Sequence, residues 1–382
     1  MKKTDLISSL LNFKVTRAAI IKLAPRLPLP QRMPSPSNIT IEISTNCNLS
    51  CTMCSRTHST ETKSQLMGPE TYENVLDNFP KLSKVFVCGA GEPLLHPDIL
   101  EIIKITKSRG ASIIMTTNAA LLTEKMARDL VKLKLDTLYV SLDGATTESY
   151  EKIRRGAKFD RVIENIKRLD QIKQESNSSL PAVELNFVGM SQNINELPGV
   201  VELAHELGLK KIYYLPVTVI GEQGIKHPHE VPELTKSVFE KATEKAKFHG
   251  ISLRLRPLEP QTQPCFSPWS NPYISIDGTI TPCCPIGSNA PGVYASDWYF
   301  NSHIEFDPEE YVLGDIFEED FSKIWNNKKY RLLRKYLSSY MREDSKKKWD
   351  KNEYFSLREK YKETEGIFSY CRICPFRFQI IC

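Results

Sequence analysis

Three cysteines on one short loop constrain this chain more than any other feature of its sequence. Residues 39–43 alternate apolar and polar side chains, which predicts a buried strand, and residues 44–46 end it. Cys47, Cys51 and Cys54 follow at once. Such a triplet is expected by chance only about 0.007 times in a chain with 10 cysteines among 382 residues. Soft sulfur ligands select zinc, Cu(I) or iron–sulfur clusters, so the spacing predicts a metal centre.

The number of thiols separates two kinds of metal site. A structural zinc site has four protein ligands. Three cysteines on a four-iron cluster leave one iron without a protein ligand, and a small molecule can bind and react there. A zinc site completed by a distant His or Cys is the alternative interpretation of the same loop.

Strand-like and helix-like runs alternate from residue 39 to about residue 255. The strand-like runs are 39–44, 84–88, 111–116, 137–142, 182–188 and 210–216, and the helical segments lie near 70–79, 96–109, 123–133, 159–174 and 194–207. This alternation predicts right-handed βαβ units and a parallel sheet. Six units fit a partial (β/α)6 TIM-like barrel, an α/β fold whose chemistry lies at the carboxyl ends of the strands.

The cysteine loop resembles the signature of the radical S-adenosylmethionine (SAM) enzymes, in which Cys-x3-Cys-x2-Cys follows the first barrel strand. The resemblance implies that Cys47, Cys51 and Cys54 hold a 4Fe–4S cluster and that SAM binds its open iron. Met53 stands where the family usually has an aromatic residue, beside the adenine. The family cleaves SAM with an electron from a partner such as flavodoxin or ferredoxin. The resulting 5′-deoxyadenosyl radical takes a hydrogen atom from the substrate.

The end of the second predicted strand extends this resemblance. The sequence Gly89-Ala90-Gly91-Glu92-Pro93 is similar to the family pattern Gly-Gly-Glu-Pro, with Ala90 in place of the first glycine. Glycines let the backbone approach a ligand closely, and a carboxylate accepts hydrogen bonds from an ammonium group. The resemblance therefore implies that Gly91 and Glu92 contact the methionine amine of SAM.

The next two predicted strands end in further candidates for SAM binding. Asn118 lies at the rim after the third strand, Ser141 ends the fourth, and Arg154 follows it. A hydroxyl suits a ribose and a guanidinium suits a carboxylate, and the resemblance assigns these roles to Ser141 and Arg154. Asp143 is interpreted as a turn residue, because Asp-Gly pairs are common in turns. Two residues on the fifth and sixth strands either line the adenosine site or belong to the core: Asn186 and Leu215.

A proline-rich stretch over residues 256–264 predicts a boundary between a barrel at 38–255 and a C-terminal domain at 256–382. Residues 276–284 suggest a hairpin-like turn around Gly278. The spacing of the cysteines in this domain resembles the auxiliary-cluster domain called twitch, the short form of SPASM. The resemblance implies one auxiliary 4Fe–4S cluster held by Cys265, Cys283, Cys371 and Cys374. A structural zinc in the same four-sulfur cage is the alternative.

Three cysteines remain outside these two sets. Cys88 ends a strand and is expected to form buried wall. Cys284 is next to a predicted cluster ligand, and packing, a spare ligand or a hydrogen-atom donor all fit it. Cys382, the last residue, either replaces one of the four auxiliary ligands or frays.

Composition and charge exclude several classes of protein. A net charge of +5 is too weak to suggest nucleic-acid binding, and no apolar run reaches the length of a membrane span. Asn12, Lys14 and Arg17 interrupt the N-terminal apolar stretch, so it is not a convincing signal peptide. Closely spaced cysteines in a chain without export signals indicate metal ligands in a reducing cytoplasm.

Residues 1–37 are expected to form an amphipathic helix and a proline-rich linker. Residues 1–32 carry seven Lys or Arg against one Asp. A helix packed on the flank of the barrel is the main interpretation, and one that touches a membrane surface or a partner is the alternative. Residues 342–364, with many alternating charges, predict a solvated helix rather than a substrate clamp.

The expected reaction is a net oxidation, in which the auxiliary cluster accepts the electron that the substrate radical gives up. One auxiliary cluster, and an N-terminal segment too short for a leader-binding domain, favour a small polyhydroxylated or sugar-like metabolite. The alternatives are a maturase that oxidises, crosslinks or epimerises a peptide, and a sugar epimerase in which Cys284 donates hydrogen. A non-catalytic iron–sulfur or zinc scaffold has no need of a SAM site. No residue in the sequence identifies itself as a base for the substrate.

Overall fold

The computed structural model describes residues 31–58, 63–217, 232–255, 266–287, 294–297, 302–305 and 311–344. Seven parallel strands form its central sheet, in the order β1-β2-β3-β4-β5-β6-β7. They are β1 (Asn38–Ile41), β2 (Lys84–Val87), β3 (Ser112–Thr117), β4 (Thr137–Ser141), β5 (Ala182–Gly189), β6 (Lys211–Pro216) and β7 (Ser252–Arg254). The six predicted strands are confirmed. The sequence did not predict β7, because three residues are too few for a periodic pattern.

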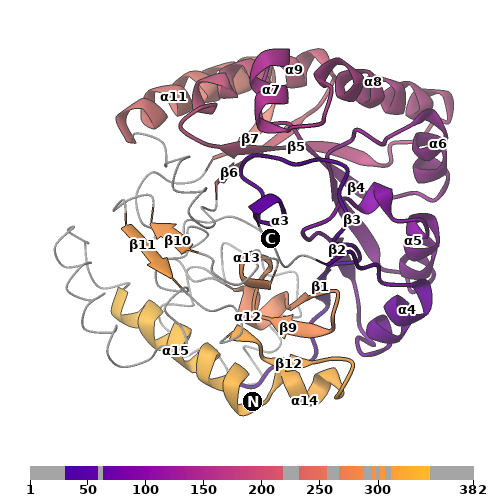
Figure 1. Cartoon of the computed structure of the whole chain (residues 1–382), viewed down its shortest axis with the longest axis vertical. Helices are drawn as coiled ribbons and strands as arrows, with labels where there is room; N and C mark the ends of the chain where they lie inside the picture. The colour runs from indigo at the N-terminus through magenta and orange to yellow at the C-terminus, as the bar shows by residue number, and fades with distance from the viewer. Residues whose placement is uncertain are drawn as a thin grey trace.

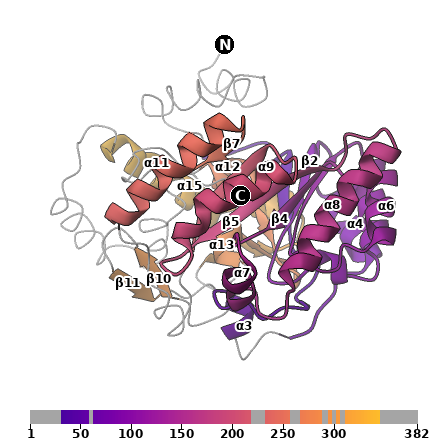
Figure 2. The same cartoon turned by 90° about the horizontal axis from the view of Figure 1, so that it is seen from above.

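Helices cover the outer face of this curved sheet (Figures 1 and 2). They are α4 (Pro69–Asp77), α5 (Ile99–Ser108), α6 (Glu124–Lys132), α7 (Thr147–Ile153), α8 (Phe159–Glu175), α9 (Leu197–Glu206) and α11 (Pro232–Phe248). The short helical turns α3 (Ser55–His58), η2 (Pro93–Leu95) and η3 (Ile194–Glu196) follow β1, β2 and β5, and α3 lies inside the ring of strands (Figure 1). Thr123 and Thr146 cap α6 and α7 by accepting hydrogen bonds from Met126 N and Ser149 N. The five predicted helices are confirmed, and α7 and α11 are additional.

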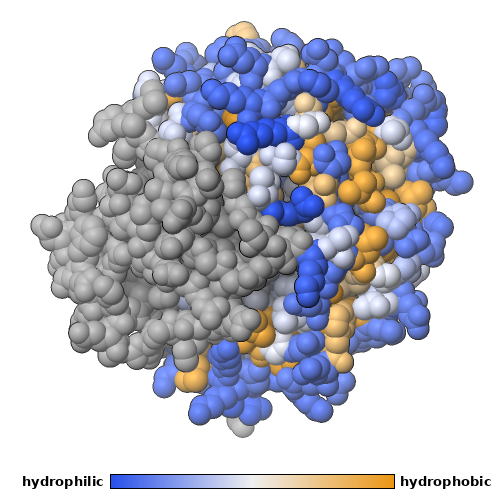
Figure 3. All heavy atoms as spheres, in the orientation of Figure 1, coloured by the Kyte–Doolittle hydropathy of each residue, from blue (hydrophilic) through white to orange (hydrophobic). Residues whose placement is uncertain are grey.

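The strand side chains alternate between the helix layer and the inner face of the sheet. On β3 and β4, Ile113, Met115, Leu138 and Val140 are fully buried. Of their neighbours along these strands, Ser112, Ile114, Thr116, Thr137 and Tyr139 are only partly buried, and Ser141 is buried. The outer edge of the molecule, over the helices, is mainly hydrophilic (Figure 3). The parallel strands therefore form one layer of an α/β core and leave their other face available for a site.

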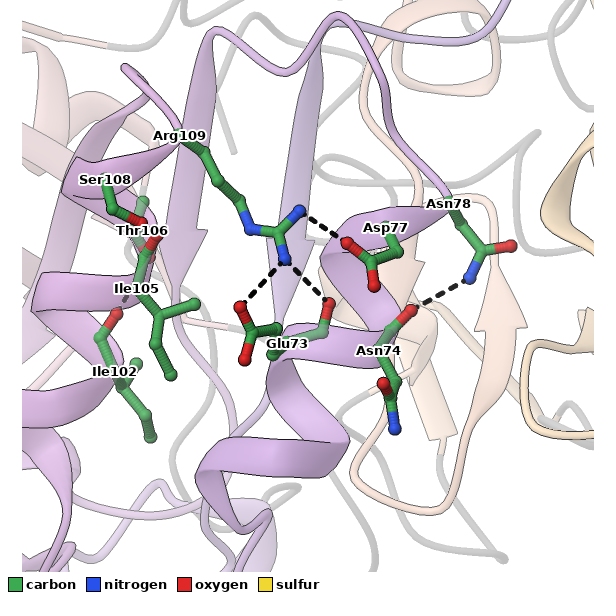
Figure 4. Close-up of polar contacts among 9 residues, drawn as sticks. All are labelled: Glu73, Asn74, Asp77, Asn78, Ile102, Ile105, Thr106, Ser108 and Arg109. Carbon is green, nitrogen blue, oxygen red and sulfur yellow. Dashed lines mark hydrogen bonds and ion pairs between the residues drawn. The ribbon is translucent and has the colours of Figure 1, made fainter.

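Arg109, just after α5, joins two helices of the outer layer. Its guanidinium contacts the carboxylate of Asp77 at 2.7 Å and that of Glu73 at 3.3 Å, both on α4 (Figure 4). Tyr72 of α4 also contacts the Thr106 hydroxyl of α5 at 2.7 Å, in the buried layer beneath. These contacts hold α4 and α5 side by side, on either side of the strand that precedes the 89–93 loop.

The C-terminal part of the chain extends the same sheet instead of standing apart from it. β8 (Tyr273–Ile274) pairs in parallel with β1, β9 (Thr279–Thr281) is antiparallel to β8, and β12 (Gly314–Asp315) is antiparallel to β9, which gives a sheet of ten strands. The predicted hairpin is confirmed, and Gly278 takes a φ of +90° in its turn, which favours glycine. The remaining elements are α12 (Ser267–Ser270), α13 (Cys284–Gly287), β10 (Tyr294–Asp297), β11 (Ser302–Glu305), α14 (Phe321–Trp325) and α15 (Lys328–Asp344).

A buried arginine on α15 ties the N-terminal linker to the C-terminal helices. Arg334 is fully buried and donates hydrogen bonds to the carbonyls of Pro268, Trp325 and Gln31 at 2.8, 2.8 and 3.0 Å. Its guanidinium stacks on the rings of Trp325 and Tyr330. Burial lowers the pKa of Arg334 to about 10, although the group stays charged at neutral pH. The cation therefore joins segments about 300 residues apart in sequence.

Replacing Arg334 should destabilise the C-terminal half of the fold. Arg334→Met keeps much of the side-chain volume but leaves three carbonyls without their donor, two of them in buried hydrogen bonds, so we expect the free energy of unfolding to fall by about 3 kcal/mol. Arg334→Lys should recover only part of this, because one ammonium cannot reach all three carbonyls. Anaerobic urea unfolding measures both variants, and wild-type stability in Arg334→Met would contradict this role.

Several expectations lie outside the described residues. They concern residues 1–30, Cys265, Cys371, Cys374, Cys382 and most of the segment 342–364. No helix within the described ranges is long and apolar enough to cross a membrane.

Candidate functional site

The three cysteines lie on the loop between β1 and α3, at the carboxyl end of the parallel strands. Cys51 is 9% exposed, and Cys47 and Cys54 are partly exposed. The Cys54 N–H donates to the carbonyl of Cys51 at 3.2 Å, which forms a tight turn between the second and third thiols. All three side chains pack against the main hydrophobic core. The sequence prediction of one loop that carries three thiols at a strand end is therefore matched by the geometry.

The backbone of this loop is fixed to the last residue of α7 and to the segment that follows it. Ser50 N–H donates to the carbonyl of Arg155 at 3.0 Å, and Thr52 N–H donates to the carbonyl of Ile153 at 2.9 Å. These bonds flank Cys51 on both sides. The cysteine loop and the end of the β4–α7 unit therefore form one rigid unit.

The three thiols are not gathered around one point. Within the described ranges, no three Cys, His, Asp or Glu side chains come close enough together to hold one metal ion. In a four-iron cluster each thiolate binds a different iron, so the sulfurs need not meet at one point. Burial raises the pKa of Cys47, and it raises the pKa of Cys51 to about 11. These thiols therefore keep their protons at neutral pH until a metal displaces them.

The loop after β2 packs directly on the start of the cysteine loop. Glu92 N–H donates to the carbonyl of Asn46 at 2.7 Å. A Cβ added at Gly91 would lie 2.2 Å from the carbonyl oxygen of Ser44 and 2.7 Å from that of Asn46. Only glycine can occupy this position without moving the backbone. Gly91 therefore brings the two predicted cofactor loops into contact.

The carboxylate of Glu92 is fully engaged with its own protein. It accepts hydrogen bonds from Leu94 N–H at 3.0 Å, the Thr117 hydroxyl at 2.6 Å and Asn118 N–H at 2.7 Å. Burial raises its pKa, and these donors oppose the rise. The side chain thus joins the ends of β2 and β3.

Asn118 links the end of β3 to the cysteine loop. Its side-chain nitrogen lies 3.0 Å from the Asn48 side-chain oxygen and 3.9 Å from the sulfur of Cys47. Its side-chain oxygen accepts from Ala120 N–H at 2.9 Å. The structure therefore places Asn118 beside the first thiol, where its amide can donate to a ligating sulfur.

Arg154 is buried at the end of α7 and paired with a carboxylate. Its guanidinium lies 2.6 Å from Asp143 Oδ2, and Asp143 Oδ1 accepts from Val188 N–H at 2.7 Å. Burial alone would lower the pKa of Arg154, but Asp143 and Cys51 raise it above its ordinary range. Nε of Arg154 is buried and has no hydrogen-bond partner among the described residues. This donor is therefore available to an anionic ligand group beside the cysteine loop.

Asp143 does more than the predicted turn role. It is completely buried, and burial raises its pKa while Arg154 opposes the rise. Asn193 also donates to the carbonyl of Asp143 at 2.9 Å. Sequence reasoning missed the ion pair because an Asp-Gly pair already has a common local explanation. The later Arg154, on the same predicted unit, was the available signal.

Polar residues line the inner face of the sheet below the cysteine loop. Ser141 and Asn186 are register partners on β4 and β5. Two residues earlier on these strands lie Tyr139 and Glu184, and Glu184 contacts Lys211 at 3.1 Å. The rings of Phe86, Tyr139 and Tyr213, from β2, β4 and β6, form a row with centroid distances of 5.8 and 5.4 Å. Leu215 follows Tyr213 on the same face, so the predicted Ser141, Asn186 and Leu215 do share one wall.

Met53 packs in a small apolar cluster at the ends of β5 and β6, where this wall continues. It contacts a group made of Ile153, Met190 and Val217, with Val188 at its edge. The cluster adjoins the ion pair, since Ile153 precedes Arg154. Met53 therefore gives the cysteine loop an apolar contact with the β5 and β6 ends.

A buried glutamate next to the site was not predicted. Glu42 follows β1, is 5% exposed, and accepts hydrogen bonds from Ala90 N–H at 2.6 Å and Ile276 N–H at 3.4 Å. Burial raises its pKa to about 7. In the sequence it is one polar position of an alternating strand. The only feature of the sequence that could have indicated a role for Glu42 is its position five residues before Cys47.

Cys88 and Cys284 meet where the barrel joins the C-terminal hairpin. Their sulfurs are 3.9 Å apart, and both residues are partly exposed. Cys283, which is also partly exposed, follows β9 and precedes Cys284 at the start of α13. Cys88 was expected to be a buried packing residue. The structure shows in addition that this residue contacts a thiol of the C-terminal domain.

Comparison with known proteins gives two family matches. Residues 41–204 match the Radical SAM superfamily, and residues 265–375 match the iron–sulfur cluster-binding domain named SPASM. The first match covers the cysteine loop and the strands up to α9. The second covers the hairpin with Cys283 and Cys284.

Two relatives match most of the chain. A protein of Pyrococcus furiosus named tungsten-containing aldehyde ferredoxin oxidoreductase cofactor-modifying protein is 25% identical over 310 residues, 79% of this chain and 84% of that protein. The AdoMet-dependent heme synthase of Methanosarcina barkeri is 24% identical over 330 residues, 78% of this chain and 85% of that one.

The crystal structure of SuiB from Streptococcus suis bound to S-adenosylmethionine has the same fold. Its TM-score is 0.62 at 17% identity, and the match covers 87% of this chain and 78% of SuiB. The structure of SuiB bound to its precursor peptide SuiA gives a TM-score of 0.60 at 18% identity, over 83% of this chain and 70% of that one.

Proposed function

The chain is a radical SAM enzyme with a C-terminal SPASM iron–sulfur domain, and we propose that it oxidises a small polyhydroxylated or sugar-like metabolite. Its cofactors are 4Fe–4S clusters and SAM. One observation carries the assignment of the site: the cysteine loop lies at one end of the sheet together with the buried Nε of Arg154, which has no hydrogen-bond partner in the described part of the chain.

Bound cofactors supply a 5′-deoxyadenosyl radical that removes a hydrogen atom from the substrate. In this proposal Cys47, Cys51 and Cys54 hold the cluster, and Arg154 binds the SAM carboxylate while Asp143 fixes its orientation. The Ser141 hydroxyl faces the ribose, and the backbone around Gly91 meets the methionine amine. Glu92 acts by fixing that backbone.

The second part of the proposal concerns the leftover electron. A substrate that loses a hydrogen atom, then a proton and an electron, is oxidised by two electrons in total. We assign the electron to one auxiliary 4Fe–4S cluster in the SPASM domain, with Cys265, Cys283, Cys371 and Cys374 as ligands and a reducing cytoplasm as its setting. A flavodoxin- or ferredoxin-type partner would supply the electron that starts the reaction.

The inner face of the sheet supports a polar small molecule. This face carries hydroxyl, amide, carboxylate and ammonium groups, which belong to Ser141, Tyr139, Asn186, Glu184 and Lys211. Such groups form hydrogen bonds with substrate hydroxyls. The names of the two long relatives also concern cofactors and haem, which are small molecules.

A peptide substrate is the second candidate. SuiB, which shares the fold, has been crystallised with its precursor peptide. An epimerase is a further alternative. Cys284 contacts Cys88 at the boundary of the two domains, and in this alternative its thiol returns a hydrogen atom to the substrate radical.

Anaerobic turnover tests the proposal. Protein reconstituted with iron and sulfide, then given dithionite and SAM, should release 5′-deoxyadenosine and contain about eight irons per chain. A non-catalytic scaffold would release no 5′-deoxyadenosine. About four irons per chain together with zinc would contradict the proposed auxiliary cluster. Incubation with candidate sugars and peptides, followed by mass spectrometry, should show a loss of two mass units for oxidation and no loss for epimerisation.

The Cys374→Ala variant tests the electron-accepting role. We expect it to cleave SAM but to form no oxidised product, because the substrate radical then has no acceptor for its electron. Product yield per 5′-deoxyadenosine is the measurement. Full coupled turnover by this variant would contradict the role.

A further inference from the structure

Glu42 connects the loop over residues 89–92 with the hairpin of the C-terminal domain. One carboxylate oxygen accepts from Ala90 N–H at 2.6 Å, in the loop that contains Gly91 and Glu92. The other accepts from Ile276 N–H at 3.4 Å, in the hairpin of the C-terminal domain. Glu42 N–H also donates to the carbonyl of Ile274 at 2.9 Å. Side chain and backbone thus both contact the hairpin.

The space around this carboxylate is tightly packed. A Cβ added at Gly89 would lie 2.4 Å from Glu42 Oε1 and 2.5 Å from its Cγ. On the other side, the buried ring of Tyr273 lies beneath α13, where a Cβ on Gly287 would approach it to 2.2 Å. The Tyr273 side chain also interacts with the carboxylate. Glycines on both sides therefore let the carboxylate and the tyrosine lie between the two domains.

Glu42 is close in sequence, or through its hydrogen bonds, to three predicted cofactor-binding segments. Five residues after it stands Cys47. On the bonded loop, Gly91 packs on the start of the cysteine loop. On the hairpin, β9 ends two residues before Cys283. A shift of Glu42 would therefore move the loop that faces SAM relative to both cysteine sets.

We propose that Glu42 is a positioning residue through which the C-terminal hairpin fixes the SAM-binding loop over residues 89–92. The proposal rests on the assignment of that loop to SAM in the proposed function. It predicts that SAM affinity depends on a residue that does not touch SAM. It also explains why the SPASM domain continues the sheet of the barrel, since β8 pairs with β1 just before Glu42.

Only a glutamate satisfies both partners. A carboxylate has two oxygens that accept, one for each N–H donor. Glutamine has one such oxygen and an NH2 group that would face the second N–H. Aspartate is one methylene shorter, so it cannot span the same two donors.

Two variants test this inference. Glu42→Gln should keep the iron content and the turnover rate at saturating SAM within about twofold of wild type, and raise the dissociation constant for SAM at least about tenfold. Gly89→Ala keeps the glutamate but displaces its carboxylate, because the added methyl would overlap Oε1, so the dissociation constant for SAM should rise in this variant too. SAM titration followed by the electron paramagnetic resonance signal of the reduced protein gives the constant directly.

A matched control and a second readout separate positioning from general damage. Glu202→Gln removes a glutamate on the outer helix α9 that pairs with His249, and should leave SAM affinity unchanged. Hydrogen exchange of the holoenzyme should show loss of protection at the amides of Ala90 and Ile276 in Glu42→Gln.

SAM affinity within twofold of wild type in Glu42→Gln would overturn the inference. If that variant loses its iron, Gly89→Ala decides, and unchanged affinity there overturns it equally. Failure of the proposed function looks different, because wild-type protein would then release no 5′-deoxyadenosine at all.

Discussion

Cys51→Ala should lower 5′-deoxyadenosine formation to less than about a thousandth of the wild-type rate. Cys51 is the most buried of the three thiols, and the backbone on both sides of it is hydrogen-bonded to the end of α7 and the segment that follows. Without it the cluster has two ligands, and the hard step of the reaction belongs to the cofactor rather than to the protein. Quantification of 5′-deoxyadenosine after anaerobic reconstitution measures the effect.

Cys88→Ala is the matched control for this variant. Cys88 follows β2, near the same end of the sheet, but lies outside the triplet and contacts Cys284. We expect this variant to retain both its clusters and its SAM cleavage. Cleavage at the wild-type rate by Cys51→Ala would show that the triplet does not hold the reactive cluster.

Asp143→Asn should both destabilise the protein and weaken SAM binding. The substitution leaves the buried Arg154 without a counter-charge, and breaking a buried pair from one side costs about 3 kcal/mol or more. The free guanidinium should also lose its orientation, since Asp143 is its only ion-pair partner among the described residues. Anaerobic urea unfolding and SAM titration measure the two effects separately.

The double variant Asp143→Asn/Arg154→Met distinguishes the two roles of the pair. Replacing both charged groups removes the unpaired buried charge, so most of the stability should return. SAM affinity should not return, because the donor for the carboxylate is gone. Recovery of SAM binding in the double variant would contradict the role of Arg154, and unchanged stability in Asp143→Asn would contradict the ion pair.

The sequence predicted the barrel well because its signals are periodic and local. Alternating strands separated by amphipathic helices predict a parallel sheet, and the cysteine loop falls at the end of the first strand in both the sequence and the structure. β7, with three residues, is too short to produce such a pattern. The joining of β8 to β1 depends on a pairing between strands more than 200 residues apart, which no local signal records.

The site was harder to predict where residues act on one another. The Cys47, Cys51 and Cys54 spacing is sufficient on its own, because all three ligands belong to one loop. Glu42 is different, because its partners are backbone N–H groups from two distant segments, and any residue type supplies those. The contact of Glu92 with SAM stays a prediction, and the sequence did not indicate that three donors of its own protein also hold this carboxylate.

The central claim is that Cys47, Cys51 and Cys54 hold a cluster incompletely and that SAM binds its open iron. Electron–nuclear double resonance on the anaerobic, reduced protein with SAM labelled by ¹⁵N at the amine and ¹⁷O at the carboxylate tests this most directly. The account predicts hyperfine coupling from both labels to the cluster, and its loss in Cys51→Ala. An uncoupled spectrum, or a loop that contains zinc instead of iron, would contradict it.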